Sequence, residues 1–177
     1  MAPRIFVGLP IVADAGHELA AFARRELGGL PVRPVAPAHL HVTLVFCGEV
    51  DGGRVDEIAA IVEEETPYDL SWTLVPTGVR QLASVVAVTY EAPAEMIAVR
   101  RALERRLVAE ELATSDGRRW LPHVTIVRGR CGARFRTPRL APPPLPLEGA
   151  EIVVYESHSA RTGTSYERRA TSPRSAA

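Results

Sequence analysis

One four-residue pattern occurs twice in this chain: His-Val-Thr-Leu at positions 41–44 and His-Val-Thr-Ile at positions 123–126. Each copy is a histidine, an apolar residue, a threonine and a second apolar residue. For a chain with 5 histidines and 46% hydrophobic residues, two such matches arise by chance in roughly one sequence in 600. One copy alone would be an ordinary strand segment, but the pair needs a common explanation.

Both copies have the alternation of a β-strand that is buried on one face. Residues i and i+2 of a strand lie on the same face, so His41 points to the same side as Thr43, while the apolar residues point into the core. His123 shares a side with Thr125 in the same way. If the two strands are neighbours, two titratable imidazoles and two hydroxyl donors line one site. In-line cleavage of a phosphoester needs this set: a base for the attacking water, an acid for the leaving oxygen and donors for the phosphate.

A metal centre is the alternative kind of site. The chain has several nitrogen and sulfur ligands near the motifs, namely His39, His41, Cys47, His123 and Cys131. However, it has no C-x-x-C or H-E-x-x-H spacing, and neither motif contains a carboxylate that would complete a hydrolytic metal site. The sequence therefore favours catalysis by imidazoles, with no metal and no other cofactor.

The apolar periodicity predicts one compact domain over residues 1–177. We expect helices at 14–27, 54–65 and 94–112, with Asp14 capping the first. Strands are expected at 5–7, 40–46, 70–75 and 85–90, from residue 120 onward, and in a hairpin of 150–156 with 165–170. The segments 30–38 and 130–146 are predicted as loops, and the tail 171–177 as disordered. This order predicts an α+β fold of mostly antiparallel sheet, in which the two motif strands belong to two similar lobes.

Composition narrows the class of protein further. No run approaches the roughly 18 to 20 uninterrupted apolar residues of a membrane span, and the N-terminus leads into a strand-like segment without a signal-peptide core. We therefore expect a cytoplasmic protein that does not enter a membrane. Cys47 and Cys131 are too few for a disulfide scaffold, so we expect two reduced thiols, at least one of them buried.

The net charge of zero hides an uneven distribution. Residues 1–99 hold 6 arginines and 13 acidic residues, a balance of −7, whereas residues 100–177 hold 15 arginines and 8 acidic residues, a balance of +7. The chain has no lysine, and the guanidinium group of arginine suits paired contacts with phosphate oxygens. The composition of the source genome also explains the absence of lysine, so this absence is not evidence for function. The positive charge of residues 100–177 gives weak support for an anionic partner.

At this point the chain resembles a known family, the two-histidine phosphoesterases, and within it the RNA 2′,3′-cyclic phosphodiesterases, also called 2′-5′ RNA ligases. The resemblance covers nearly the whole chain. It includes the opening segment 4–7, the first motif within 40–49, the second within 120–128 and the closing hairpin that ends near Tyr166. The paired motifs and the proline before His123 are its specific parts. Cys47 and His39 depart from the usual pattern, where leucine and a polar amide are more common.

The resemblance implies two pseudo-symmetric lobes with the active-site cleft between them, and metal-independent hydrolysis of an RNA terminal 2′,3′-cyclic phosphate to a 2′-phosphate. It implies that His41 and His123 are catalytic, and that Thr43, Thr125 and Arg128 bind the phosphate. The partners it implies are RNA ends that carry a cyclic phosphate, tRNA fragments among them, and we expect a monomer.

Three points stay open from sequence alone. Strict alternation puts Arg128 on the core side of its strand, so a bulge or the strand end must redirect it. Phe46 is also on the core side by alternation, which favours packing over its other interpretation, the stacking of a base. We expect neutral His123 to accept a proton from water and protonated His41 to donate one, although the exchanged roles satisfy the same chemistry.

The substrate has alternatives as well. A small cyclic-phosphate nucleotide, such as a cyclic phosphate of ADP-ribose, would keep the chemistry and change the partner. A module that binds RNA ends without turnover belongs to a different functional class.

Overall fold

The computed structural model describes residues 2–115, 117, 119–160 and 163–172. In this part of the chain there are three α-helices: α1 (Ala13–Leu27), α2 (Val55–Glu65) and α3 (Ala94–Ala109). The strands are β1 (Arg4–Pro10), β2 (Val32–Pro34), β3 (His41–Glu49), β4 (Trp72–Leu82), β5 (Val85–Glu91), β6 (His123–Gly129), β7 (Leu147–Gly149), β8 (Ile152–Ala160) and β9 (Gly163–Ser172). Short 3-10 turns occupy Pro37–His39 and Gly52–Arg54.

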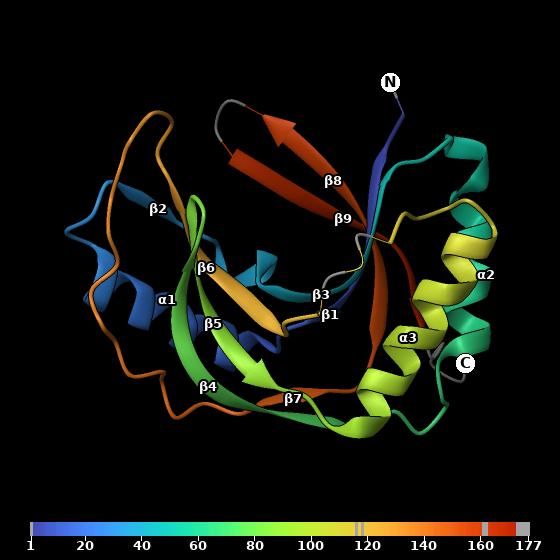
Figure 1. Cartoon of the computed structure of the whole chain (residues 1–177), viewed down its shortest axis with the longest axis horizontal. Coiled ribbons are helices and arrows are strands. Elements are labelled where there is room, and N and C mark those ends of the chain that lie inside the picture. The colour runs from blue at the N-terminus through green and yellow to red at the C-terminus, as the bar shows by residue number, and fades with distance from the viewer. Residues whose placement is uncertain (1, 116, 118, 161–162, 173–177) are drawn as a thin grey trace.

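The strands form a curled sheet in the order β7-β4-β5-β6-β3-β1-β8-β9, with β2 on β6 (Figure 1). All of the paired strands are antiparallel. The two motif strands, β6 and β3, lie at the centre of this order, with β5, β4 and β7 on one side and β1, β8 and β9 on the other. This arrangement makes two lobes that meet between β6 and β3, so the expected α+β fold is confirmed.

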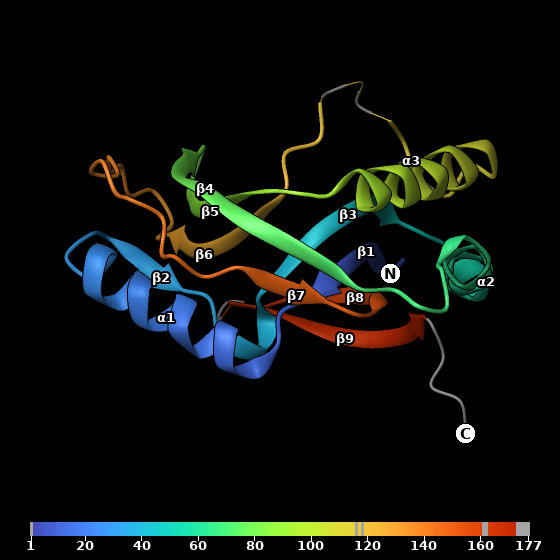
Figure 2. The ribbon, with the colours of Figure 1, turned by 90° about the horizontal axis from the view of Figure 1, so that it is seen from below.

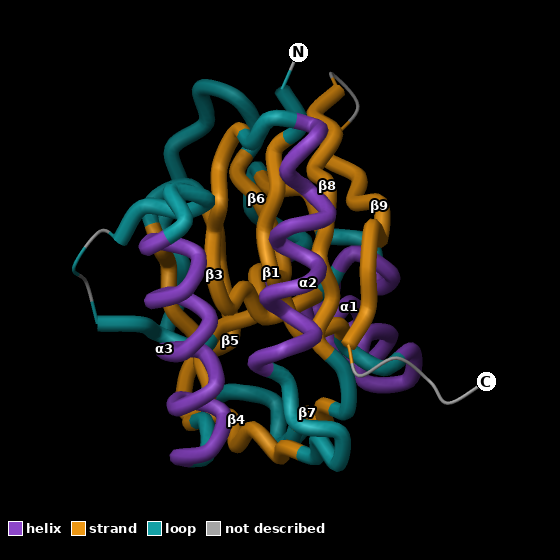
Figure 3. Tube along the Cα trace, turned by 90° about the vertical axis from the view of Figure 1, so that its right-hand side faces the viewer, coloured by secondary structure: helices purple, strands orange, loops and turns teal. Residues whose placement is uncertain are grey.

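The helices are placed by their apolar stripes. In α1, Leu19, Phe22 and Ala23 are buried, and the helix packs against β2 and β6 at one end of the molecule (Figure 2). At the other end, α3 contacts β3, whereas α2 contacts β8 and β9 (Figure 3). The helices α2 and α3 also contact each other. None of the helices in the described part of the chain is long and apolar enough to cross a membrane.

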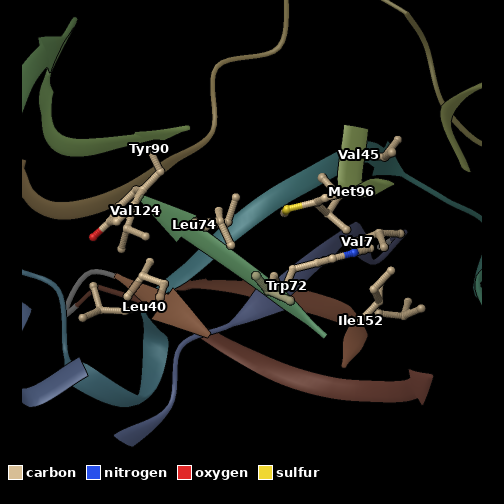
Figure 4. Close-up of a cluster of buried hydrophobic side chains, with 14 of the residues drawn as sticks. Val7, Leu40, Val45, Trp72, Leu74, Tyr90, Met96, Val124 and Ile152 are labelled. Atoms are coloured by element: carbon tan, nitrogen blue, oxygen red, sulfur yellow. The ribbon is translucent and has the colours of Figure 1, made fainter. Parts of the chain in front are cut away.

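The core joins the two lobes. Leu74 and Val124 come from one lobe and Val7 from the other, and all three side chains are fully buried in the same cluster with Met96 of α3 (Figure 4). Complete burial of an aliphatic side chain of this size contributes roughly 1.5–3 kcal/mol. The lobes are therefore held to each other by the packing that lies under the motif strands.

Several predicted boundaries are wrong. The third helix ends at Ala109 instead of residue 112, because the backbone turns into the left-handed region at Glu111 (φ 56°). Asp14 does not cap the first helix: it lies in the first turn, after an N-cap at Val12. The strand expected from residue 120 begins at His123. The first two residues of the tail predicted as disordered belong to β9, and residues 173–177 lie outside the described residues.

Candidate active site

The two motifs lie side by side at the centre of the sheet. Val42 of β3 pairs with Val124 of β6 in an antiparallel register. The residues that flank such a pair also face each other across the strands, so His41 lies beside Thr125 and Thr43 beside His123. Both valines are fully buried, whereas the histidines and threonines are partly exposed. The predicted convergence of four polar side chains on one face is thus present in the structure.

Each motif ends in a β-bulge, at its fourth residue. Along β3, Thr43 and Val45 pair with consecutive residues of β1, which leaves Leu44 as the extra residue. Along β6, Thr125 and Val127 pair with consecutive residues of β5, which leaves Ile126 as the extra residue. In both strands the extra residue and the valine after it are buried. The next side chain therefore returns to the motif face.

Arg128 and Phe46 are the residues that these bulges redirect. Arg128 is exposed and its guanidinium donates a hydrogen bond to the hydroxyl oxygen of Tyr166 at 3.1 Å. Of the two expected causes, a bulge or the strand end, the structure shows the bulge. Phe46 was expected on the core side, and that expectation is wrong: its side chain is 51% exposed. The guanidinium carbon of Arg4 lies 5.6 Å from the centre of the Phe46 ring.

Both catalytic candidates, His41 and His123, are held by the same kind of hydrogen bond. Nδ1 of His41 lies 2.8 Å from the carbonyl oxygen of His39, and Nδ1 of His123 lies 2.8 Å from that of Leu121. A carbonyl only accepts, so Nδ1 carries the hydrogen in each ring. Nε2 is then the atom left for chemistry: it accepts a proton when the ring is neutral and donates one when the ring is charged.

The surroundings of the two rings differ. The His41 ring lies against three aromatic rings, with centroid distances of 4.7 Å to Phe6, 5.9 Å to Tyr155 and 4.9 Å to Tyr166. This burial lowers the pKa of His41 from 6.5 to about 4, although the His39 carbonyl acts in the opposite direction and the Arg128 charge adds to the lowering. In the described part of the chain, the His123 ring makes no aromatic contact. His41 is therefore neutral at neutral pH in the ligand-free protein.

The aromatic cover of His41 was not found from the sequence. Phe6, Tyr155 and Tyr166 come from β1, β8 and β9, and they meet through the pairing of Phe6 with Tyr155 and the ring contacts with Tyr166. The only local signal was the position of Tyr166 in the closing hairpin. Long-range strand pairing, which no short motif reveals, brings this hairpin beside His41.

A second group of residues contacts β3 at the carbonyls of Thr43 and Leu44. The indole nitrogen of Trp120 donates to the carbonyl oxygen of Thr43 at 3.0 Å. Nε of Arg100 in α3 donates to the carbonyl oxygen of Leu44 at 3.1 Å, and its guanidinium lies over the Trp120 ring at 5.5 Å. Arg100 also forms a bidentate ion pair with Glu104. These contacts tie the segment before His123 to the strand that carries His41.

The structure does not assemble the ligands of the alternative metal site. In the described residues, the side chains that bring three ligand atoms within 4.8 Å of one another are Glu156, His158 and Glu167, on β8 and β9. Both of these carboxylates also form ion pairs with Arg169. Cys47 is partly buried, and burial raises the pKa of its thiol to about 12, whereas Cys131 is exposed. Both cysteines are free thiols, and Cys47 is only partly buried where full burial of one thiol was expected.

Two cavities lie next to the motifs. One is lined by His39, whose carbonyl binds His41, and the other by Leu121, whose carbonyl binds His123. A cavity of about 510 Å³ is lined by His39 together with Arg128 and Tyr166. A larger one of about 940 Å³ is lined by Leu121 together with Trp120 and Arg100. Both volumes are in the range of small-molecule sites. Their linings include the neighbours of the motif histidines in the chain but neither histidine itself.

Comparisons with known proteins agree with this geometry. The family model of the 2′-5′ RNA ligase superfamily matches residues 17–161. Among solved structures, the fold is similar to a crystal structure described as a phosphoesterase, with a TM-score of 0.79, 23% identity and 97% of each chain covered. It is also similar to E. coli LigT complexed with 3′-AMP, with a TM-score of 0.77, 22% identity and 97% of each chain covered.

TT0787 of Thermus thermophilus has the same fold, with a TM-score of 0.77, 19% identity and coverage of 95% of this chain and 96% of that chain. No curated protein matches the chain. The family model spans well over half of the sequence and includes both histidine motifs. The chain therefore belongs to the 2′-5′ RNA ligase superfamily of two-histidine phosphoesterases.

Proposed function

We propose that the protein hydrolyses the terminal 2′,3′-cyclic phosphate of RNA to a 2′-phosphate and a free 3′-hydroxyl. The observation that carries this proposal is the pairing of Val42 with Val124, which sets two imidazoles and two threonine hydroxyls on one face of adjacent strands. Both rings keep Nε2 for proton transfer. One ring then serves as base and the other as acid around a single phosphorus atom.

In the proposed reaction, the oxygen of a water molecule bonds to phosphorus while the bond from phosphorus to the 3′-oxygen breaks. Neutral His123 takes the proton of the water on Nε2, and protonated His41 gives its Nε2 proton to the 3′-oxygen. Thr43 and Thr125 donate hydroxyl hydrogen bonds to the phosphate, and Arg128 supplies a positive charge beside it. The two rings end with exchanged protonation states, which proton exchange with solvent restores.

The division of roles follows from the cover of the two rings. Among the described residues, no aromatic ring lies against His123, so we assign the attacking water to its side, whereas three rings lie against His41. A ring with a pKa of about 4 is also a strong proton donor once it is charged. The anionic phosphate of the substrate favours protonated His41, because a neighbouring negative charge raises the pKa of an imidazole.

RNA is the proposed substrate, with tRNA fragments among the candidate sources. Crystal structures of LigT, which has this fold, contain 3′-AMP, phosphate, ATP or NADP+. Those ligands all carry phosphate, and all but free phosphate are nucleotides, which supports a nucleotide phosphoester as the ligand here. Phe46 is proposed as a surface on which a base stacks, since it is half exposed and is opposite Phe6, whose ring lies against His41.

The test is product analysis in the presence of EDTA. A short oligonucleotide ending in a 2′,3′-cyclic phosphate is incubated with the protein, and ³¹P NMR identifies the terminal phosphate. We expect a 2′-phosphate at a rate that chelation leaves unchanged, because no step requires a metal-activated water. A 3′-phosphate, or activity that appears only on adding a divalent ion, would contradict the proposal.

Variants separate turnover from binding in the same assay. His41→Gln and His123→Gln should each lower turnover by about 10²-fold or more, and His17→Gln should leave it unchanged. His17 is a matched control, because its Nδ1 is also 2.8 Å from a backbone carbonyl, that of Ala13 in α1, but it is exposed. Binding of the oligonucleotide without any turnover would instead identify a non-catalytic RNA-end-binding module.

A further inference from the structure

The ionisable side chains that line the smaller cavity, next to His41, are basic, apart from the hydroxyl of Tyr166. The cavity has a volume of about 510 Å³ and is lined by Arg33, Arg128 and His39, with the hydroxyl side chains Thr164, Ser165 and Tyr166. None of its lining residues is Asp or Glu. A cavity of this kind has donors for an anion and no internal counter-charge.

The two arginines of this cavity face each other directly. In the antiparallel pairing of β2 with β6, Arg33 is opposite Arg128. Like charges at directly opposite positions destabilise a sheet. Among the described residues, Arg128 bonds only the hydroxyl of Tyr166, and Arg33 forms no hydrogen bond or ion pair with any side chain. No carboxylate in this part of the chain therefore forms an ion pair with either guanidinium group.

The cavity adjoins the reactive histidine. Its lining residue His39 accepts the Nδ1 hydrogen of His41, and its lining residue Tyr166 packs edge-on against the His41 ring at 4.9 Å. A nucleotide with its cyclic phosphate at the motif face can therefore extend into this cavity. Opposite Cα atoms on paired strands are about 4.5–5.5 Å apart, and long arginine side chains allow each guanidinium to bind a separate phosphate.

We infer that Arg33 binds a second phosphate, the one on the 5′-oxygen of the nucleoside whose 2′,3′-cyclic phosphate is opened. The inference rests on the proposed function and deepens it, because it names a part of the substrate that the reaction itself does not need. Arg128 faces the reacting phosphate and Arg33 the next one along the chain. Each guanidinium offers the paired donors that suit phosphate oxygens.

Two sources supply a phosphate at this position. In RNA it is the internucleotide diester, and in a free nucleotide it is a 5′-phosphate. Three substrates distinguish them: a nucleoside 2′,3′-cyclic phosphate, the same compound with a 5′-phosphate, and a dinucleotide that ends in the cyclic phosphate. We measure kcat/KM for each with the wild-type protein, Arg33→Gln and Arg33→Lys.

The wild-type protein should prefer a substrate with the second phosphate by about tenfold or more. In Arg33→Gln this ratio should fall close to one, and Arg33→Lys should retain part of it. Arg24→Gln is the matched control: Arg24 is exposed on α1, has no ion pair among the described residues and lines neither cavity, so its ratio should stay at the wild-type value. A gain for the dinucleotide alone identifies RNA, and a gain for the 5′-phosphate alone identifies a free nucleotide.

Two results would overturn the inference. One is a wild-type protein without preference for the second phosphate. The other is a loss in Arg33→Gln that is equal for all three substrates, which would assign both arginines to the reacting phosphate. If no substrate is turned over, the proposed function fails, and equilibrium binding decides the role of Arg33: adenosine 2′,5′-bisphosphate should bind the wild-type protein, but not Arg33→Gln, more tightly than adenosine 2′-phosphate.

Discussion

At the scale of single residues, the main finding is that two identically anchored histidines have different surroundings. Both donate Nδ1–H to the carbonyl two residues earlier in the chain. His41 is in addition desolvated by the rings of Phe6, Tyr155 and Tyr166. The proposed difference in role between the two motifs therefore rests on the residues that surround them, and the motif sequence does not contain it.

The lowered pKa of His41 predicts a dependence of stability on pH. The ring has a pKa of about 4 in the folded protein and an ordinary 6.5 when unfolded. Between these values the unfolded chain binds the extra proton, so stability falls as pH drops from about 6.5 to 4. His41 accounts for about 3 kcal/mol of this loss at most. Urea unfolding of the wild type and His41→Gln from pH 4 to 7.5 measures it as a stability difference that changes with pH.

His17→Gln controls for removing an imidazole as such, because His17 is exposed on α1. The stability difference between His41→Gln and the wild type should change with pH in this window more than the difference between His17→Gln and the wild type. If the two differences change alike, the pKa of His41 is not lowered in the folded protein. NMR titration of the ring with added inorganic phosphate extends the test, since the bound anion should raise its pKa.

Sequence alone identified the polar residues of the site but not their full setting. His41, Thr43, His123 and Thr125 follow from a repeated pattern and a period of two. The side of the strand taken by Phe46 did not, because one bulge residue reverses the alternation that follows it. Arg128 was placed on the motif face only through the resemblance to a family, and the bulge at Ile126 gives the physical reason.

At the scale of elements, the support of β3 by the segment before β6 is a testable feature. Trp120→Phe retains a ring over Arg100 but removes the hydrogen bond to the Thr43 carbonyl. We expect the free energy of unfolding to fall by about 1 kcal/mol. We expect kcat to fall by about tenfold, because small displacements of the motif strand misplace the reacting groups. Urea unfolding and steady-state kinetics measure the two effects.

The other tryptophan is the matched control. Trp72 is buried in β4 and belongs to the core cluster, so Trp72→Phe should lower stability through lost packing and leave kcat at the wild-type value. A wild-type kcat in Trp120→Phe would show that the hydrogen bond to Thr43 has no part in positioning the site. If kcat falls equally in both variants, the fall results from lower stability and not from the lost hydrogen bond.

The elements that sequence predicted are the ones with enough residues to show a period. The helices, the motif strands and the closing hairpin were found for this reason, with errors of a few residues at their ends. The strands β2 and β7 have three residues each, and β2 lies in a proline-punctuated segment that was predicted as a loop. A three-residue strand shows no alternation and is fixed by its partner, which for β2 is β6.

At the scale of the whole molecule, the two lobes give the site one histidine each. The order β7-β4-β5-β6-β3-β1-β8-β9 places His123 and His41 on the two innermost strands, which have matching bulges. The surroundings of the two histidines differ. Aromatic rings of the β3 lobe lie against His41, and β2 places Arg33 opposite Arg128 of β6. A pseudo-symmetric framework thus carries an asymmetric site, which a reaction with one acid and one base requires.

The pH dependence of kcat in three proteins tests this account most directly. The wild-type protein should give a bell, because one ring must be neutral and the other charged, and the two apparent pKa values belong to the pair. His41→Gln should lose the alkaline limb, since no donor remains to be deprotonated, and His123→Gln should lose the acidic limb. The reverse loss would exchange the two roles. A wild-type profile that is flat from pH 5 to 9 would contradict paired acid–base catalysis.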